Sequence, residues 1–268
     1  MVSRRFQVWL DTIRNPTCLA SCAIAAVAFL APSARGLSYA ADIVATKPGT
    51  ISVVGPIVKG DADKLRRIIR EQRFGVGAII LDGPGGEVDE AIQMADIIRP
   101  LLPIVAVAPG RFCASACFFV WLAGNPRNAQ SREYMQRVAR QKNSQTGGAV
   151  GLHRPYRANI DGVVNDQHQL MRRIQEYLEK QMVSRRLIDL MMSRPSNDVY
   201  WLTSTDFDEL GEYSPQIEEL LIRKCEYVRV TTRSADAGLD PNRMLRSITC
   251  ANDVLGDARA KAWKEVKR

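Results

Sequence analysis

Short apolar runs alternate with amphipathic segments over most of the chain. Four runs are mostly apolar and too short for helices, so they predict strands: 51–54, 76–81, 104–107 and 149–152. Between and after them, apolar positions recur at helical spacing, which predicts helices at 61–72, 88–98, 114–123 and 165–192. Strands that alternate with helices in this way pack through right-handed crossovers. The pattern therefore predicts an α/β fold with mostly parallel strands.

The alternation changes character in two places. Residues 125–148 are polar and predict an inserted loop with a short helix near 134–140. From Ser214 onward the pattern weakens, with a helix expected at 217–227, a strand at 228–231 and an exposed, charged helix over the last 15 residues. We therefore expect an α/β domain at 42–213 and a C-terminal extension at 214–268.

The N-terminal 41 residues have the pattern of an export signal. Arg4, Arg5 and Arg14 precede an apolar stretch at 18–31, and small residues follow it up to Ala41. The stretch is shorter than the ~20 residues that a membrane-spanning helix needs. Residues 1–41 are predicted to be a cleaved signal peptide, with a retained membrane anchor as the alternative. Either reading places the rest of the chain in an exported, periplasmic compartment.

Composition narrows the classes of partner. The chain is 46% hydrophobic and 25% charged, as in an ordinary globular protein. Its net charge is +8, and 33 basic and 28 acidic residues remain once 1–41 are set aside. This mild excess is spread along the chain, and no run of lysine and arginine is interleaved with aromatic residues. A nucleic-acid partner is not expected.

Two segments suggest chemistry. The sequence Asp-Gly-Pro-Gly-Gly at 82–86 follows a predicted strand, and its glycines are suited to exposing backbone N–H groups. Ser115 begins an apolar helix, and the N–H of Ala116 would be a second donor to a developing oxyanion. His153 follows the strand at 149–152 and is a candidate base. The alternatives are a plain strand-to-helix turn, a helix-capping serine and a structural histidine.

The remaining histidine and the cysteines suggest no metal or cofactor. His168 lies in a polar helical stretch and is expected to face solvent, and two histidines without a thiolate cluster do not form a zinc site. A disulfide between Cys225 and Cys250 is predicted for an oxidising compartment. Cys113 and Cys117 would strain a regular helix if they were bonded, so packed thiols are expected there, with their redox state left open.

Four segments together resemble the proteolytic subunit of Clp protease, whose superfamily includes signal peptide peptidase A and the crotonases. In chain order they are Gly-Thr-Ile-Ser-Val-Val-Gly-Pro-Ile at 49–57, the turn at 82–86, Ala-Ser-Ala at 114–116 and Leu-His-Arg-Pro at 152–155. The resemblance covers 49–213 and is strongest to exported Clp-protease-like bacterial proteins, in which a serine also stands between two alanines and two cysteines. It implies a spiral of β-β-α units, homo-oligomers and peptide or protein substrates.

The resemblance also implies roles for single residues. Ser115 would be the nucleophile, His153 the general base, and the N–H groups of Gly86 and Ala116 the oxyanion hole. The third triad residue of the Clp subunit is an aspartate, but this chain has Val199 at the aligned position and Asp198 one residue earlier. Asp198 is the candidate for that role. Two other aspartates, Asp206 and Asp208, are poorer candidates because Thr-Ser-Thr-Asp at 203–206 predicts a capping box.

These observations predict an exported serine hydrolase, a Clp-like peptidase with a Ser-His(-Asp) site. The alternative is a catalytically silent Clp-fold module that binds or assembles in the periplasm. A crotonase-type acyl-CoA enzyme is a third reading, which export and the pairing of Ser115 with His153 both disfavour.

Overall fold

Parallel strands carry most of the fold, as the alternation of apolar and amphipathic segments predicts. A computed structural model describes residues 40–108, 110–129, 148–156, 165–229 and 240–268. Its larger sheet has the strand order β1-β2-β3-β4-β6. The strands are β1 (Asp42–Lys47), β2 (Thr50–Val54), β3 (Ala78–Asp82), β4 (Ile104–Val107) and β6 (Arg127–Asn128). The β1 strand is antiparallel to β2, and every other pair is parallel. The fold is thus of the mixed α/β class, and the spiral of β-β-α units stays a prediction.

A second, smaller sheet carries the residues that suggested chemistry. Its order is β5-β7-β8, formed by β5 (Phe112–Ala114), β7 (Ala149–Leu152) and β8 (Tyr200–Trp201). The β5 and β7 strands are parallel, with Ala114 opposite Gly151, and β8 is antiparallel to β7. Parallel neighbours end at one edge of a sheet, so the residues that follow β5 and β7 leave it together.

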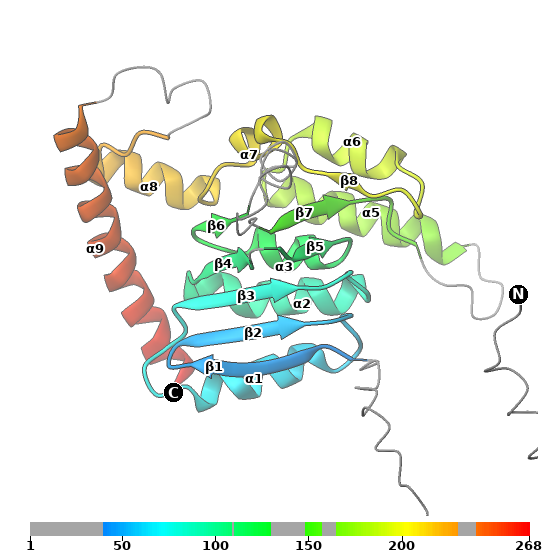
Figure 1. The fold of residues 1–268 in the computed structure, drawn as a ribbon, viewed down its shortest axis with the longest axis horizontal. Helices are drawn as coiled ribbons and strands as arrows, with labels where there is room; N and C mark the ends of the chain where they lie inside the picture. Colours follow the sequence, from blue (N-terminus) through cyan, green and yellow to red (C-terminus); the bar gives the residue numbers. More distant parts are fainter. Residues whose placement is uncertain (1–39, 109, 130–147, 157–164, 230–239) are drawn as a thin grey trace, which may run out of the picture. The chain divides into compact units, whose positions relative to one another are not determined.

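Helices account for most of the described residues outside the two sheets and their connecting loops. They are α1 (Asp61–Glu71), α2 (Val88–Ile98), the 3-10 helix η2 (Arg99–Leu101), α3 (Cys117–Leu122), α5 (Asn165–Lys180), α6 (Arg185–Ser193), α7 (Ser204–Leu210), α8 (Pro215–Cys225) and α9 (Pro241–Val266). In Figure 1, α1 and α2 lie on one face of the larger sheet. Every residue of α3 is buried, as expected for a helix that is apolar on all sides.

The structure differs from the predicted elements where local turns override periodicity. The helix predicted at 165–192 is two helices, because Met182 adopts a φ of 56° and Ser184 then caps α6 through its side chain. The helix predicted at 114–123 begins only at Cys117, because Phe112–Ala114 pair as β5. The strand β1 was not predicted. The predicted helix near 134–140 and residues 230–231 lie outside the described residues, and 226–229 are irregular.

The C-terminal helices pack at the amino ends of the parallel strands. Arg259 of α9 donates from Nε to the carbonyl oxygen of Leu102, which precedes β4, at 2.7 Å. Trp263 lies against Gly75, which precedes β3. Residues 38–268 form one compact unit. The end of the chain is therefore joined to the sheet rather than attached only through its linker.

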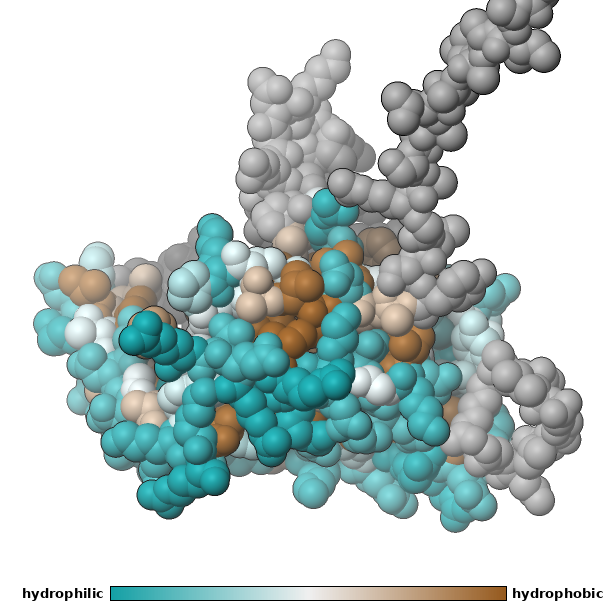
Figure 2. Space-filling view, turned by 90° about the horizontal axis from the view of Figure 1, so that it is seen from below, coloured by the Kyte–Doolittle hydropathy of each residue, from teal (hydrophilic) through white to brown (hydrophobic). Residues whose placement is uncertain are grey.

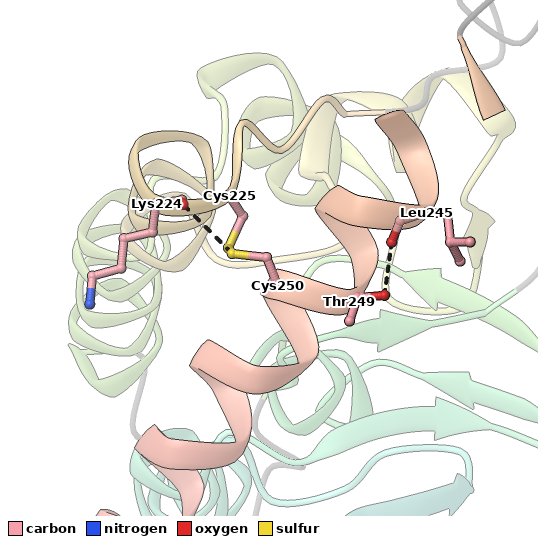
Figure 3. Close-up of a disulfide and its surroundings, with 5 residues drawn as sticks. All are labelled: Lys224, Cys225, Leu245, Thr249 and Cys250. Atoms are coloured by element: carbon pink, nitrogen blue, oxygen red, sulfur yellow. Dashed lines mark hydrogen bonds between the residues drawn. A yellow bond between two sulfur atoms is a disulfide. The ribbon is translucent and has the colours of Figure 1, made fainter. Parts of the chain in front are cut away.

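Two further contacts hold this extension together. Cys225, the last residue of α8, is bonded to Cys250 of α9, with 5.5 Å between their Cα atoms (Figure 3). The buried Arg127 of β6 donates from Nη2 to the carbonyl oxygens of Leu210, at 2.9 Å, and Tyr213. Burial lowers the pKa of Arg127 to about 9.

Strand β1 forms one edge of the larger sheet and is mostly exposed. Five of the six residues of β1 are exposed, with Asp42 and Lys47 at its two ends. Figure 2 shows the molecule from below, relative to the view in Figure 1. This face is mostly hydrophilic, with apolar side chains gathered near its centre. Within the described residues, no helix is long and apolar enough to cross a bilayer.

Candidate active site

The glycine turn is held between two neighbouring segments. The N–H of Gly83 donates to the carbonyl oxygen of Phe112 at 2.8 Å, and the N–H of Ile57 donates to that of Gly85 at 2.7 Å. Gly85 has a φ of 97° and Gly86 a φ of 138°, a region that favours glycine. The turn is therefore fixed on one side by β5 and on the other by the segment that follows β2.

Gly85 lies directly against the serine turn. A Cβ atom added at Gly85 would lie 2.6 Å from the Cβ of Ser115 and 2.7 Å from the backbone nitrogen of Ala116. No real side chain tolerates such distances, so only glycine fits at this position. Two segments that are 29 residues apart in the sequence are thus brought into contact.

Ser115 has an unusual backbone conformation. It directly follows β5, adopts a φ of 55°, and is followed by Ala116 and the six residues of α3. A non-glycine residue in this region costs energy and is common at functional turns. A serine on a tight strand-to-helix turn is also the arrangement that exposes the nucleophile in other hydrolases. Ser115 does not cap α3 with its side chain, so the capping alternative is not what the structure contains.

One backbone amide in the glycine turn and one in the serine turn have no acceptor among the described residues. Within the described part of the chain, neither the N–H of Gly86 nor the N–H of Ala116 donates to a protein group. These are the two amides that the resemblance assigns to the oxyanion hole. Buried amides are nearly always paired, and that of Ala116 belongs to a fully buried residue. A pair of unused donors beside a serine is suited to binding a carbonyl oxygen.

His153 leaves the smaller sheet at the same edge as Ser115. It is the first residue after β7, as Ser115 is the first after β5, and the N–H of Ser115 donates to the carbonyl oxygen of Gly151 at 3.0 Å. His153 is buried, and its Nδ1 lies 2.9 Å from the carbonyl oxygen of Arg154. With a proton on Nδ1 for this bond, Nε2 is the basic nitrogen.

The structure gives Asp198 another partner. Its carboxylate is exposed and accepts a hydrogen bond from Arg194 at 2.8 Å, and no contact with His153 is found among the described residues. Val199 instead lies against Gly151 of β7. The backbone carbonyl of Arg154 therefore holds His153 in this structure, and the catalytic role of Asp198 stays a prediction.

Asp206 has the structural role that its sequence context predicts. It is buried and forms a capping box with Thr203 at the start of α7. Burial opposes its ionisation, but hydrogen bonds from Thr203, Arg186 and Tyr200 outweigh burial and hold its pKa below the usual value. Its oxygens are committed to these partners, so Asp206 is a stabilising residue of α7.

The expectation of free thiols at Cys113 and Cys117 is wrong in this structure. The two cysteines form a disulfide with 5.2 Å between their Cα atoms. The expectation assumed a regular helix between them, but Cys113 is in β5 and Cys117 is the first residue of α3. The turn at Ser115 brings them together. The signal that was available is a serine with small neighbours between two cysteines, in a chain for which an oxidising compartment was predicted.

The remaining histidine and the cavities add no group to this site. His168 is exposed on α5, and no cluster of three metal-ligating side chains is found in the described ranges. A cavity of about 320 Å³ lies between α9 and the α/β domain, and its lining includes Ile104, Pro126, Tyr213 and Tyr227. It contains none of the predicted site residues.

Among known proteins, similarity is found to a solved structure and not to a family model or a curated protein. No protein-family model matches the sequence, and no curated protein matches it either. The structure is similar to ClpP1 from Listeria monocytogenes, with a TM-score of 0.44 and 18% identity over 62% of this chain and 89% of that chain. Similarity at this level decides neither the details of the fold nor the function of this chain.

Proposed function

We propose that this protein is an exported serine hydrolase that cleaves peptides, with Ser115 as nucleophile and His153 as general base. The observation that carries the proposal is the contact between the glycine turn and the serine turn. Gly85 has room for no side chain beside Ser115, and the amides of Gly86 and Ala116 are without acceptors among the described residues. A nucleophile and two unused donors are the main parts of an acyl-transfer site.

The proposed reaction follows from these groups. Nε2 of His153 takes the proton of the Ser115 hydroxyl while Oγ attacks the carbonyl carbon of the substrate. The N–H groups of Gly86 and Ala116 stabilise the negative charge on the carbonyl oxygen. His153 then gives its proton to the leaving amine, and water releases the acyl group by the same steps in reverse. The carbonyl of Arg154 orients the imidazole during both transfers.

Export, oligomers and the spiral of β-β-α units are further parts of the proposal. Disulfides persist in oxidising compartments and are rare in the cytosol, so the bonds Cys113–Cys117 and Cys225–Cys250 support export. Homo-oligomers, a peptide or protein substrate and the spiral rest on the resemblance alone. Fractionation of expressing cells, with mass spectrometry of the protein's N-terminus, tests export and cleavage after Ala40 or Ala41.

A fluorophosphonate probe tests the chemistry, since it reacts with activated serines. We expect the folded wild-type protein to be labelled at Ser115, and both Ser115→Ala and His153→Gln to abolish labelling. Ser193→Ala and His168→Gln are matched controls, because both residues are exposed on helices and neither belongs to the proposed site. They should label as the wild type does. A folded wild type that stays unlabelled at neutral pH would overturn the proposed hydrolase.

One observation favours a second candidate function, a catalytically silent binding or assembly module. Asp198 is paired with Arg194, and Val199 occupies the position that the Clp resemblance gives to the catalytic aspartate. Loss of the carboxylate from a triad costs about four orders of magnitude in rate. Labelling separates the two functions, because the serine of a silent module would not react with the fluorophosphonate probe.

A further inference from the structure

We propose that the disulfide between Cys113 and Cys117 is a positioning element that holds Ser115 in its reactive backbone conformation. The inference rests on the proposed function, because it concerns the same nucleophile. It assigns to the two cysteines a role in forming the site, in addition to any effect on stability. Neither sulfur needs to touch a substrate, since the effect is transmitted through the backbone of residues 114–116.

The chain reverses direction within the disulfide ring. The disulfide closes a ring of five residues with Ser115 at its centre. Four residue steps in an extended strand span about 13 Å, whereas the Cα atoms of Cys113 and Cys117 are 5.2 Å apart. The chain must therefore reverse between them, and the φ of 55° at Ser115 is where it reverses. The disulfide and the positive φ of Ser115 thus belong to the same reversal of the chain.

Hydrogen bonds hold the serine turn only in part. The N–H of Ser115 donates to Gly151, and its carbonyl oxygen accepts from the N–H of Phe118 at 2.9 Å. The next amide, that of Ala116, has no acceptor among the described residues. Because this amide must point at a substrate rather than at the protein, hydrogen bonding cannot fix it before a substrate binds. The disulfide restrains the chain on both sides of it.

The disulfide between Cys113 and Cys117 is buried. Cys113 is fully buried and Cys117 is only 4% exposed. A buried disulfide is not readily reached by a reducing protein, so it is suited to lasting restraint. Ser115, by contrast, remains partly exposed. The structure therefore combines an inaccessible restraint with an accessible nucleophile.

Formation of the bond would couple reactivity to export. The two thiols lose two protons and two electrons to a disulfide oxidant. The disulfide of that oxidant is cleaved to two thiols, so that one S–S bond replaces another. Cytosolic thiols stay reduced. The chain would thus carry an unrestrained serine turn until it reaches an oxidising compartment.

The test compares this disulfide with the other one. The full chain is prepared as wild type, as Cys113→Ala/Cys117→Ala and as Cys225→Ala/Cys250→Ala, and labelling of Ser115 by a fluorophosphonate is timed well below each melting temperature. We expect the first variant to label about 100-fold more slowly, the effect of a misplaced reacting group. The second should lose thermal stability and label at the wild-type rate. Wild-type labelling by the folded first variant would overturn the proposal.

A second measurement separates this inference from the proposed function. Hydrogen exchange of peptides covering 113–119 needs no catalysis, and it should accelerate in Cys113→Ala/Cys117→Ala while peptides of α1 and α9 keep their protection. If the wild type is never labelled, the hydrolase proposal fails, and exchange still tests the restraint. Unchanged exchange at 113–119 would overturn it. If the double alanine variant does not fold, Cys113→Ala/Cys117→Val, which restores buried volume, is used for both measurements.

Discussion

The two ends of the parallel strands are built on different principles. At the carboxyl ends, the site depends on close backbone contacts, with Gly85 against Ser115 and a disulfide that closes five residues. At the amino ends, α9 packs through side chains, with Arg259 bonded to backbone carbonyls and a disulfide that spans 25 residues of sequence. Both ends contain a disulfide and a glycine contact. Residue type alone therefore does not decide the role of a disulfide or a glycine contact. What differs between the two ends is the number of residues between the bonded cysteines and how closely the backbones approach.

The largest expected effect comes from Gly85→Ala. The added Cβ would overlap Ser115 and the carbonyl oxygen of Ala114, each at 2.6 Å, so the serine turn must move. We expect fluorophosphonate labelling to fall by about 10³-fold, comparable to the loss of an oxyanion donor.

Gly60→Ala is the matched control for Gly85→Ala. Gly60 has a similar φ of 100°, and no atom lies within 4 Å of its added Cβ, so it isolates backbone strain from collision. It should lose about 1 kcal/mol of unfolding free energy and label as the wild type does. Equal loss of labelling in both variants would contradict the importance of contact at the carboxyl edge.

The two disulfides should differ in their contribution to stability. By the loop-entropy relation, the ring of five residues contributes about 2 kcal/mol and the longer loop to Cys250 about 3.5 kcal/mol. Denaturant titration of the two double alanine variants measures both values. A larger loss of unfolding free energy on removal of Cys113 and Cys117 would reverse the comparison.

Asp206→Asn should reduce stability without changing the site. Removing its charge weakens the hydrogen bonds from Arg186 and Thr203, at a cost of about 2–3 kcal/mol in unfolding free energy. The pKa of Asp206 is lowered by folding. Its stabilising contribution is therefore present above the unfolded pKa of about 3.8 and is lost as pH falls through the lower folded value.

A pH series of denaturant titrations checks this prediction. The wild type should lose stability more steeply than Asp206→Asn below about pH 4, and the two proteins should converge in acid. Parallel curves for the two proteins would contradict the proposed role. Labelling of Ser115 at neutral pH should be the same in both.

The smallest expected effect is that of Asp198→Asn. Its ion pair with Arg194 is exposed, so its loss should change the unfolding free energy by no more than about 0.5 kcal/mol. Labelling should stay within about threefold of wild type, because the carbonyl of Arg154 already holds His153. A fall near 10⁴-fold would instead identify Asp198 as the third triad residue.

Sequence patterns predicted the strands β2, β3, β4 and β7, but they missed the other strands and the turns. The runs at 104–107 and 149–152 are the observed strands β4 and β7, because buried parallel strands are apolar throughout. Only three residues of β5 precede the turn, and they merge with the apolar α3 in the sequence, so one helix was predicted. A positive φ at a serine leaves no compositional signal. The disulfide at Cys113 was missed for the same reason.

The candidate site shows a similar division. Chain order and strand ends were enough to predict that the glycine turn lies against Ser115, while the roles of His153 and Gly86 stay predictions. The partner of His153 was not predictable, because any residue supplies a backbone carbonyl. Nor does the sequence indicate that Val199, rather than its neighbour Asp198, lies on Gly151; that depends on how residues 194–199 leave α6.

The placement of α9 has a practical consequence for handling the protein. Its last turn lies near Gly75 and the end of α1, where Lys267 donates to the carbonyl oxygen of Arg70, while Ser115 lies past the opposite ends of the strands. An affinity handle fused after Arg268 would thus anchor the molecule by the side remote from its serine. Probes and candidate substrates in a surface-capture assay would then approach the serine from the side opposite the support.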